Sequence, residues 1–413
     1  MNLLNKKIIT TIMLLSSLTL FADDFSDDSG FGDDSSFGSF GDDFGSSSAS
    51  EVEFSGEVNI GATAYFADDI LEESAEFYPE ASITLNYTGS LADLTIVTDM
   101  TTDEITLDEI YTSIYAEKFN AEVGLLKTVW GKGDKLHVVD LLNSTDYSNY
   151  FTEDYLESKK ATAMVKFNVP LGETGVLELA YVPLFEGDTI PTDSIWTPYS
   201  ISTLMSAYNL TSENVEGMIP DMDTLKNGQA GLRLTGTIGS FDLGTLYYYG
   251  YDKQPNVTST LELEYERMQM FGIEAGKVLG GFNLRAEGAY YLMDDSDNSL
   301  NYVAGFDYNL PLNNLNLNIQ IKGNYMLDSD EDNTNLLVGK LSDTYNHEKV
   351  SASVTGLYYI EDGDYMIKPE VSTTLGDTLT VEFASGIFFG EDDTTLGQYD
   401  DNDYLSVNLK YMF

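Results

Sequence analysis

The residues best able to carry chemistry gather between positions 107 and 143. His137, one of only two histidines in the chain, stands between Asp134 and Asp140, a spacing that could support general acid and base catalysis in a hydrolase. No Gly-x-Ser-x-Gly elbow, phosphate loop or metal-binding histidine pair accompanies it. We therefore expect His137 to be an ordinary loop residue and the chain not to be an enzyme.

The same region contains acids on an expected strand followed by a glycine-rich turn. Its members are Asp108, Glu109, Trp130, Gly131, Gly133, Asp134 and Asp140. Gly131 and Gly133 permit a tight turn. The positions of Leu136, Val139 and Leu142 predict the apolar face of a short helix. Such a loop could fold inward and narrow a pore, or it could be a structural plug, and the sequence leaves both open.

From residue 52 onward the chain consists of segments of about ten residues in which apolar and polar residues alternate, the pattern of a transmembrane β-barrel. In residues 231–238, Leu232 and Leu234 share one face while Arg233 lies on the other. We predict an all-β fold, a transmembrane antiparallel β-barrel of about 18 strands. Because residues 336–345 alternate poorly, 16 strands remain an alternative, and a soluble β-sandwich or β-helix is a less favoured one.

The alternation places charged residues of both signs on the face that would line the lumen. They are Glu57, Glu80, Glu109, Glu122, Glu178, Glu274, Glu287, Glu370 and Glu382 among the acids, and Lys166, Arg233, Arg285, Lys322 and Lys368 among the bases. Facing acidic and basic side chains orient polar solutes, and the acidic excess favours cations. The alternative is that at least half of these charges simply pair across neighbouring strands.

Turn lengths give an independent indication of the topology. If the N-terminus is periplasmic, short turns at residues 89–92, 118–120, 172–175, 240–242, 280–281 and 312–314 alternate with longer, acidic outer connections at 131–158, 186–228, 294–300, 328–335 and 391–403. Aromatic pairs end the outward strands and predict an outer girdle. These pairs are Tyr65 with Phe66, Tyr290 with Tyr291, Tyr358 with Tyr359, Phe388 with Phe389, and the run 247–249.

The two ends of the chain carry export and assembly signals. Residues 1–22 have the basic start, apolar stretch and small residue of a signal peptide, and residues 23–51 form an Asp/Ser/Gly/Phe-rich segment that predicts a disordered periplasmic tail. Loss of Lys6 and Lys7 with the signal takes the net charge from −49 to −51. The barrel is expected over residues 52–413, closing on Tyr411 and Phe413 as an assembly signal.

Residues 107–143, with Trp130, Gly131 and Asp134 as a Trp-Gly-x-x-Asp signature, resemble a family of bacterial outer-membrane barrels of uncharacterised function. That family is allied to the alginate-export type of 18-stranded channel. The resemblance implies a porin-like outer-membrane channel for passive diffusion of small solutes. The expected width agrees, because 16 to 18 strands leave an aqueous lumen.

Two other functions stay open: a surface adhesin or structural barrel with a plugged pore, and a transporter of hydrophobic, fatty-acid-like compounds. The helical spacing of Ile201, Leu204, Met205 and Tyr208 predicts an amphipathic helix that either lines the entrance or packs on neighbouring loops.

Expected partners are outer-membrane lipids, the barrel-assembly machinery and a small-molecule solute, and a homo-oligomer is compatible with the sequence. The acidic charge excludes nucleic acid. The chain has no cysteine, so it forms no disulfide. No cofactor is expected beyond loose divalent cations at the outer-loop acids Asp328, Asp330, Glu331 and Asp332.

Overall fold

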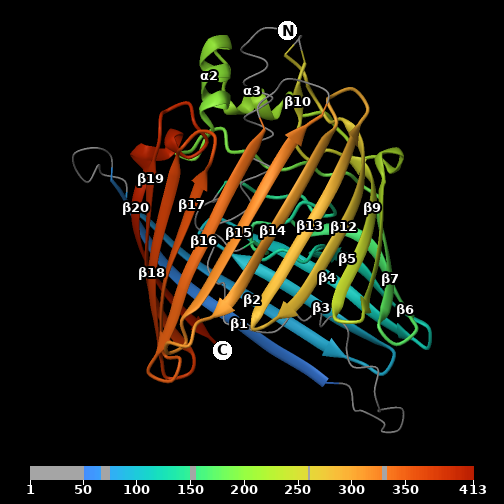
Figure 1. Cartoon of the computed structure of the whole chain (residues 1–413). Coiled ribbons are helices and arrows are strands. Elements are labelled where there is room, and N and C mark those ends of the chain that lie inside the picture. Colours follow the sequence, from blue (N-terminus) through green and yellow to red (C-terminus); the bar gives the residue numbers. More distant parts are fainter. Residues whose placement is uncertain (1–50, 67–74, 149–154, 259–260, 328–332) are drawn as a thin grey trace.

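Eighteen antiparallel strands form one closed barrel in the computed structural model (Figure 1), which describes residues 51–66, 75–148, 155–258, 261–327 and 333–413. β1 (Glu51–Phe66) pairs with β2 (Ala75–Thr88) on one side and with β20 (Asp403–Met412) on the other. No strand of the described barrel therefore has a free edge. The predicted antiparallel barrel of 18 strands is confirmed, and the alternative of 16 is wrong.

The other barrel strands follow in chain order, each hydrogen-bonded to the next. They are β3 (Ala92–Met100), β4 (Ile105–Ala116), β5 (Phe119–Leu126), β6 (Thr162–Leu171), β7 (Gly175–Val182), β8 (Gln229–Ile238), β9 (Phe241–Tyr251), β12 (Arg267–Leu279), β13 (Phe282–Met293), β14 (Ser299–Asn309), β15 (Asn316–Met326), β16 (Thr334–Tyr345), β17 (Val350–Tyr359), β18 (Tyr365–Leu375) and β19 (Leu379–Phe389).

The remaining described elements lie in connections between barrel strands. They are the hairpin of β10 (Asn256–Val257) and β11 (Leu263–Glu264), the helices α2 (Tyr199–Tyr208) and α3 (Ser212–Glu216), and the 3₁₀ turns η1 (Leu225–Asn227) and η2 (Gly397–Asn402). Within the described ranges, no helix is both long and apolar enough to cross a bilayer.

Three predicted features lie outside the described residues. They are the signal peptide at residues 1–22, the tail at residues 23–51 except Glu51, which begins β1, and the acidic cluster at residues 328–332. All three stay predictions.

The polarity of the barrel wall is inverted relative to that of a soluble protein. On β8, Arg233 is 5% exposed, whereas its neighbours Leu232 and Leu234 are 38% and 42% exposed. On β15, Asn318, Gln320 and Lys322 are buried in the same way. Alternate residues of a strand point to opposite faces, so the apolar side chains cover the outside and the polar ones the inside. This is the arrangement of a barrel that faces lipid.

Short turns and long connections occupy opposite ends of the barrel (Figure 1). One of the two-residue turns joins β12 to β13 through Gly280 and Gly281, whose φ angles are 61° and 89°. A two-residue hairpin of this twist requires positive φ at both positions, which glycine adopts without strain. The alternation predicted from the sequence is therefore present, although the connection of residues 101–104 between β3 and β4 is short for the long-loop end.

The aromatic pairs at the strand ends do not form one outward girdle. Phe66, Tyr358 and Phe389 are exposed, but the partner of each, namely Tyr65, Tyr359 and Phe388, is buried inside the barrel. Adjacent residues on a strand must point to opposite faces, so each pair contributes one ring to the outside and one to the interior. The prediction of an outer girdle was therefore correct for only one residue of each of these pairs.

The last residue completes the wall at the β1–β20 seam. The backbone N–H of Phe413 donates to the carbonyl of Gly56 at 2.9 Å, and its own carbonyl accepts from the Gly56 N–H at 3.0 Å. Its ring lies 5.9 Å from that of Phe54 and 6.4 Å from that of Tyr411. The role of Tyr411 and Phe413 in assembly stays a prediction.

A charge placed on the outer face should destabilise the barrel according to its depth. Ile273, at the centre of β12, is 64% exposed, and Leu279, at the end of the same strand and on the same face, is 58% exposed. We expect Ile273→Lys to lower the free energy of unfolding in lipid vesicles by about 2 to 4 kcal/mol and Leu279→Lys by about 1 kcal/mol or less. Urea titration of the folded protein measures both, and equal losses would contradict the placement of β12 across the bilayer.

Candidate constriction site

The connection between β5 and β6 folds into the barrel and packs on its inner wall. This inserted loop (residues 127–161, described at 127–148 and 155–161) buries Trp130, Leu136, Val139 and Leu142 completely. Two wall glycines make room for it. A Cβ atom at Gly231 of β8 would collide with the Trp130 ring, and one at Gly272 of β12 would lie 2.9 Å from Cγ1 of Val139. The loop therefore fits against the β8 to β12 side of the wall.

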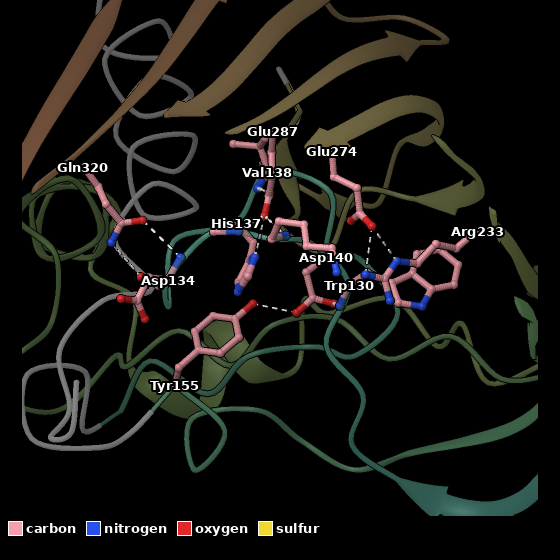
Figure 2. Close-up of polar contacts among 12 residues, drawn as sticks. Trp130, Asp134, His137, Val138, Asp140, Tyr155, Arg233, Glu274, Glu287 and Gln320 are labelled. Carbon is pink, nitrogen blue, oxygen red and sulfur yellow. Dashed lines mark hydrogen bonds and ion pairs between the residues drawn. The ribbon is translucent and has the colours of Figure 1, made fainter. Parts of the chain in front are cut away.

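Glu287 of β13 is the principal anchor of the inserted loop (Figure 2). Its Oε1 accepts the backbone N–H groups of Lys132 at 2.8 Å and Gly133 at 2.6 Å, and lies 2.8 Å from Nδ1 of His137. Its Oε2 accepts the N–H of Val138 at 2.8 Å. One buried carboxylate thus satisfies three backbone donors and a histidine ring.

The apolar residues that predicted a helix are buried, but no helix forms in the described part of the inserted loop. The backbone donors of this segment bond instead to side chains of the wall, among them those of Glu287 and Gln320. The expected helix through Leu136, Val139 and Leu142 was wrong because an α-helix needs those donors for its own carbonyls.

Asp134 forms a second anchor on β13 and β15. Its carboxylate lies 3.1 Å from the Arg285 guanidinium and accepts from Asn318 Nδ2 at 2.6 Å. Its backbone bonds twice to the Gln320 amide, with the Asp134 N–H donating at 3.0 Å and the carbonyl accepting at 2.8 Å. Arg285 also lies 3.1 Å from Asp307 of β14, so this anchor spans three strands.

Asp140 connects separate parts of the inserted loop to one another. Its carboxylate accepts the Trp130 N–H at 3.1 Å and the Tyr155 hydroxyl at 2.6 Å, and it lies 2.8 Å from Lys159 Nζ. Burial raises the pKa of Tyr155 well above its ordinary value, with the Asp140 charge acting in the same direction. Tyr155 therefore stays protonated and donates. His137, Asp134 and Asp140 each have a separate partner, and the structure does not bring them together as a catalytic group.

Most of the other predicted lumen charges also lie on the inner face and bond there. Arg233 pairs with Glu274 at 2.9 Å across β9, where a Cβ at Gly244 would strike the glutamate. Lys166 pairs with Glu122 at 2.7 Å. Two further predicted acids also have partners. Glu109 accepts the Lys127 N–H, and Glu57 lies 3.5 Å from Lys410.

Glu80, Glu178, Lys322, Lys368, Glu370 and Glu382 share the inward parity of their strands. The register of β4 shifts at Asp108, opposite Val97 and Thr98 of β3, and the adjacent Asp108 and Glu109 both contact Lys127. Within the described residues, no group of three or more His, Asp or Glu side chains is arranged to hold a metal ion.

A second connection crosses the mouth of the barrel at the end with the long loops (Figure 1). This mouth loop (residues 183–228) runs from β7 to β8, yet its α2 lies above the opposite wall near β17 to β19 (Figure 1). Trp196 is buried there, with its ring 6.0 Å from Tyr65, 5.9 Å from Phe388 and 5.6 Å from Tyr399. No local sequence pattern indicates this tether, because its aromatic partners lie in three distant segments.

The amphipathic stripe on α2 packs on a neighbouring loop. Ile201 and Leu204 are buried against Val257 of β10, whereas Tyr208 is exposed. The sequence left open whether this helix lines the entrance or packs on neighbouring loops. Ile201 and Leu204 pack on a neighbouring loop.

Removing the Glu287 carboxylate should free the inserted loop. We expect Glu287→Ala to leave three backbone N–H groups without their acceptor, at a cost on the order of 3 kcal/mol or more, so that the loop moves and the pore conductance rises. Glu382→Ala, on the inner face of β19, is the matched control. Trypsin cleavage at Lys132 and Lys135 reports the release independently, and unchanged cleavage and conductance in Glu287→Ala would contradict the anchor.

Removing the Trp196 ring should detach the mouth loop from the far wall. Truncation of a buried tryptophan costs about 3 to 5 kcal/mol, and we expect Trp196→Ala to lower the opening free energy of residues 190–208 by an amount of this order. Native-state hydrogen exchange measures the change. The neighbouring, exposed Ile195→Ala is the control, and equal exchange in the two variants would show that the tether lies elsewhere.

Comparison with known proteins places this barrel among others of its shape. Solved structures of similar fold include Pseudomonas aeruginosa OccK3 (OpdO), with 9% identity, 88% of this chain and 96% of that chain covered and a TM-score of 0.55. P. aeruginosa OccK11 (OpdR) has 10% identity, 88% and 96% coverage and a TM-score of 0.53. Acinetobacter baumannii OccAB4 has 11% identity, 88% and 98% coverage and a TM-score of 0.50.

At these identities the likeness shows a shared barrel fold and no more. No curated protein sequence matches the chain significantly. A family model does match, over residues 48–292, which include the inserted loop and its Glu287 anchor. The chain belongs to this family, described as "Protein of unknown function (DUF1302)".

Proposed function

We propose that this protein is a porin-like channel of the bacterial outer membrane, passing small solutes by diffusion with a preference for cations. Its N-terminus is placed on the periplasmic side, where the short turns lie, and outer-membrane lipids surround the wall. We also propose that the chain is related to alginate-export-type channels and that Trp-Gly-x-x-Asp is a signature of its family.

The observation that carries the proposal is the unequal filling of the lumen. On β8, β12, β15 and β16 at least three successive alternate residues are buried, because the inserted loop and its neighbours cover the inside of the wall. On β2, β3 and β4 no residue is buried on either face. Solvent therefore reaches the inner face on the β2 to β4 side, which is where a solute path would run.

The described residues on this side are predominantly acidic. A cavity of about 440 Å³ is lined by Asp99 and Asp108 of the wall and by acids of the loops, with two lysines. The loop residues concerned are Asp146, Glu157, Lys159, Lys160 and Glu186. Five carboxylates against two ammonium groups give a negative potential that attracts cations and repels anions.

Glu157 brings the inserted loop into electrostatic range of the far wall. Its carboxylate interacts with Glu80 of β2 and with Lys410 of β20. This is the place where loop and wall charges face each other across the path, so we assign the ion preference to Asp99, Glu157 and Glu80.

The alternative functions have weaker support. A transporter of hydrophobic compounds would need an apolar pocket, whereas the cavity on the β2 to β4 side is lined mainly by charged side chains. A plugged surface protein would be expected to show no current. No enzymatic role is proposed, since His137 bonds to Glu287 inside the barrel wall.

Single-channel recording of the refolded protein in a planar bilayer, with a KCl gradient, tests the channel. We expect steady currents with a reversal potential that shows cation preference. Persistently closed membranes would overturn the proposal and favour a plugged, surface-binding barrel.

Neutralising the acidic path should reduce the cation preference. We expect the double variant Asp99→Asn/Glu157→Gln to shift the reversal potential toward zero while the protein still conducts. The control Glu213→Gln/Glu216→Gln removes the same charge from α3 in the mouth loop and should leave the reversal potential unchanged. An equal shift in both variants would mean that overall charge, and not this path, sets the preference.

A further inference from the structure

Two extended segments, one from the inserted loop and one from the mouth loop, form a partition beside the acidic path. The partition consists of residues 144–147 and 186–189. The Tyr147 N–H donates to the Thr189 carbonyl at 2.9 Å, and the Thr189 N–H donates to the Thr145 carbonyl at 2.9 Å. These bonds pair the two segments in parallel, as in a β-bridge.

The partition separates two cavities. Asp146 and Glu186 line the acidic cavity of about 440 Å³, through which the proposed path runs. Thr145, Tyr147 and Asp188 line a second cavity of about 120 Å³. If the mouth-loop segment moved away from the inserted loop, the two cavities would join and the path would widen at this point.

Asp188 joins three connections of the barrel at the partition. Its Oδ1 accepts the Thr145 N–H of the inserted loop at 2.8 Å, and its own N–H donates to the Lys253 carbonyl of the β9–β12 connection at 2.9 Å. Lys253, which is 6% exposed, donates through Nζ to the Glu186 carbonyl at 3.3 Å. The closed partition therefore withdraws a carboxyl and an ammonium group from water.

Charged groups of several elements surround Asp188 and its neighbour Asp252. The cations that act on Asp188 are Lys253, Lys159 and Lys160. Two of them have other acids as partners, since Lys159 lies 2.8 Å from Asp140 and Lys160 pairs with Glu186. The other acid that acts on Asp252 is Glu266, and the nearby tyrosines are Tyr147, Tyr248, Tyr265 and Tyr291. The second cavity is also lined by His137, Asp297 and Lys322.

The cost of burial outweighs the attraction of the lysines. Burial raises the pKa of Asp188 and of Asp252 to about 6, and it lowers the pKa of Lys253 to about 8. In an open, hydrated partition an aspartate would have its ordinary pKa of about 3.9. The closed form therefore gains up to about tenfold per pH unit for each carboxyl as the pH falls from about 6 to about 4.

The closed form is least favoured near neutral pH, where all three groups are charged. Above about pH 8, loss of the Lys253 proton favours closing again, because the ammonium group of an open partition keeps its proton to about pH 10.4. Acid therefore strengthens the closed form, although it protonates buried acids.

We propose that residues 186–189 are a pH-sensitive gate of the acidic path, which closes onto the inserted loop in acid and opens near neutral pH. The effect on current rests on the proposed channel function, but the movement itself does not require conduction. Acid also protonates carboxylates of the path and so reduces its cation preference. The gate is therefore read from the frequency of openings and not from ion preference.

Single-channel recording of the full refolded chain at pH 7 and pH 5 tests the gate. We expect the ratio of open to closed time to fall by at least about tenfold at pH 5. Asp188→Asn keeps an acceptor for the Thr145 N–H and is uncharged, like the protonated acid. This variant should be closed more often than the wild type at pH 7, and its pH effect should be about tenfold smaller.

Asp193→Asn is the matched control, because it removes the same charge from an exposed position of the mouth loop. It should behave as the wild type does. Equal pH effects in Asp188→Asn and Asp193→Asn, or more frequent opening of Asp188→Asn at pH 7, would overturn the proposal.

A disulfide across the partition tests the movement directly. The chain has no cysteine, and Asp146 and Thr189 are β-bridge partners, so Asp146→Cys/Thr189→Cys places two thiols within disulfide reach. With oxidation verified by thiol titration, we expect the oxidised protein to stay closed at pH 7 and the reduced protein to open again. Equal opening of the oxidised and reduced forms would contradict the gate.

Amide hydrogen exchange separates the gate from the channel. Protection of the Tyr147 and Thr189 amides, corrected for the intrinsic pH dependence of exchange, should rise at least about tenfold from pH 7 to pH 5. Steady currents with pH-independent protection would overturn the gate alone. Rising protection with closed membranes at both pH values would overturn the channel and support the movement.

Discussion

The rest of the structure depends on one constraint, which is that the backbone of a long irregular loop lies inside the barrel and must be hydrogen-bonded there. A backbone taken from water must have its N–H groups bonded, and the inner wall supplies the acceptors. Glu287 alone receives three of these donors from the inserted loop, and Gln320 bonds both backbone groups of Asp134. The loop therefore needs no secondary structure of its own, and its course is fixed by side chains on β13 and β15.

This constraint explains the composition of the facing wall. Where the loop lies against the barrel, the wall contributes either polar acceptors or glycines, since Gly231 and Gly272 leave room for Trp130 and Val139. Gly244 in the same way leaves room for the Arg233 and Glu274 pair. The glycines thus make room for bulky side chains, and the polar residues accept the backbone donors of the loop.

The fold was largely predictable from sequence, because period-two alternation is local and each strand shows it independently. The weakest segment, residues 336–345, belongs to β16, where Leu336 and Val338 point inward and join the buried core beneath the outer loops. Because these inward-facing residues are apolar, the sequence of β16 does not alternate between apolar and polar residues. The same interior core takes one ring of several aromatic pairs, which is why the predicted girdle was only half correct.

The candidate site was predictable only in part. Residues such as Gly133, Asp134 and Asp140 stood out by type, and the inward charges followed from strand parity. Their partners did not, since Glu287 is 154 residues from Gly133 and no local pattern relates the two. The helix expected at residues 136–142 failed for the same reason, because the acceptors that compete for its donors come from distant strands.

The charge of the lumen follows from this one-sided packing. The chain has only 20 lysine and arginine residues against 69 acids, and many of the inward cations are held where the loop meets the wall. Arg285 bonds Asp134, Lys159 bonds Asp140, and Lys166 bonds Glu122. These pairs neutralise buried charges, each of which would be costly without its counter-charge. On the β2 to β4 side, solvent can screen the carboxylates, so acidic side chains are tolerated along the part of the lumen that water reaches. In the channel that we propose, this single anchored loop sets both the width of the path and the sign of its potential.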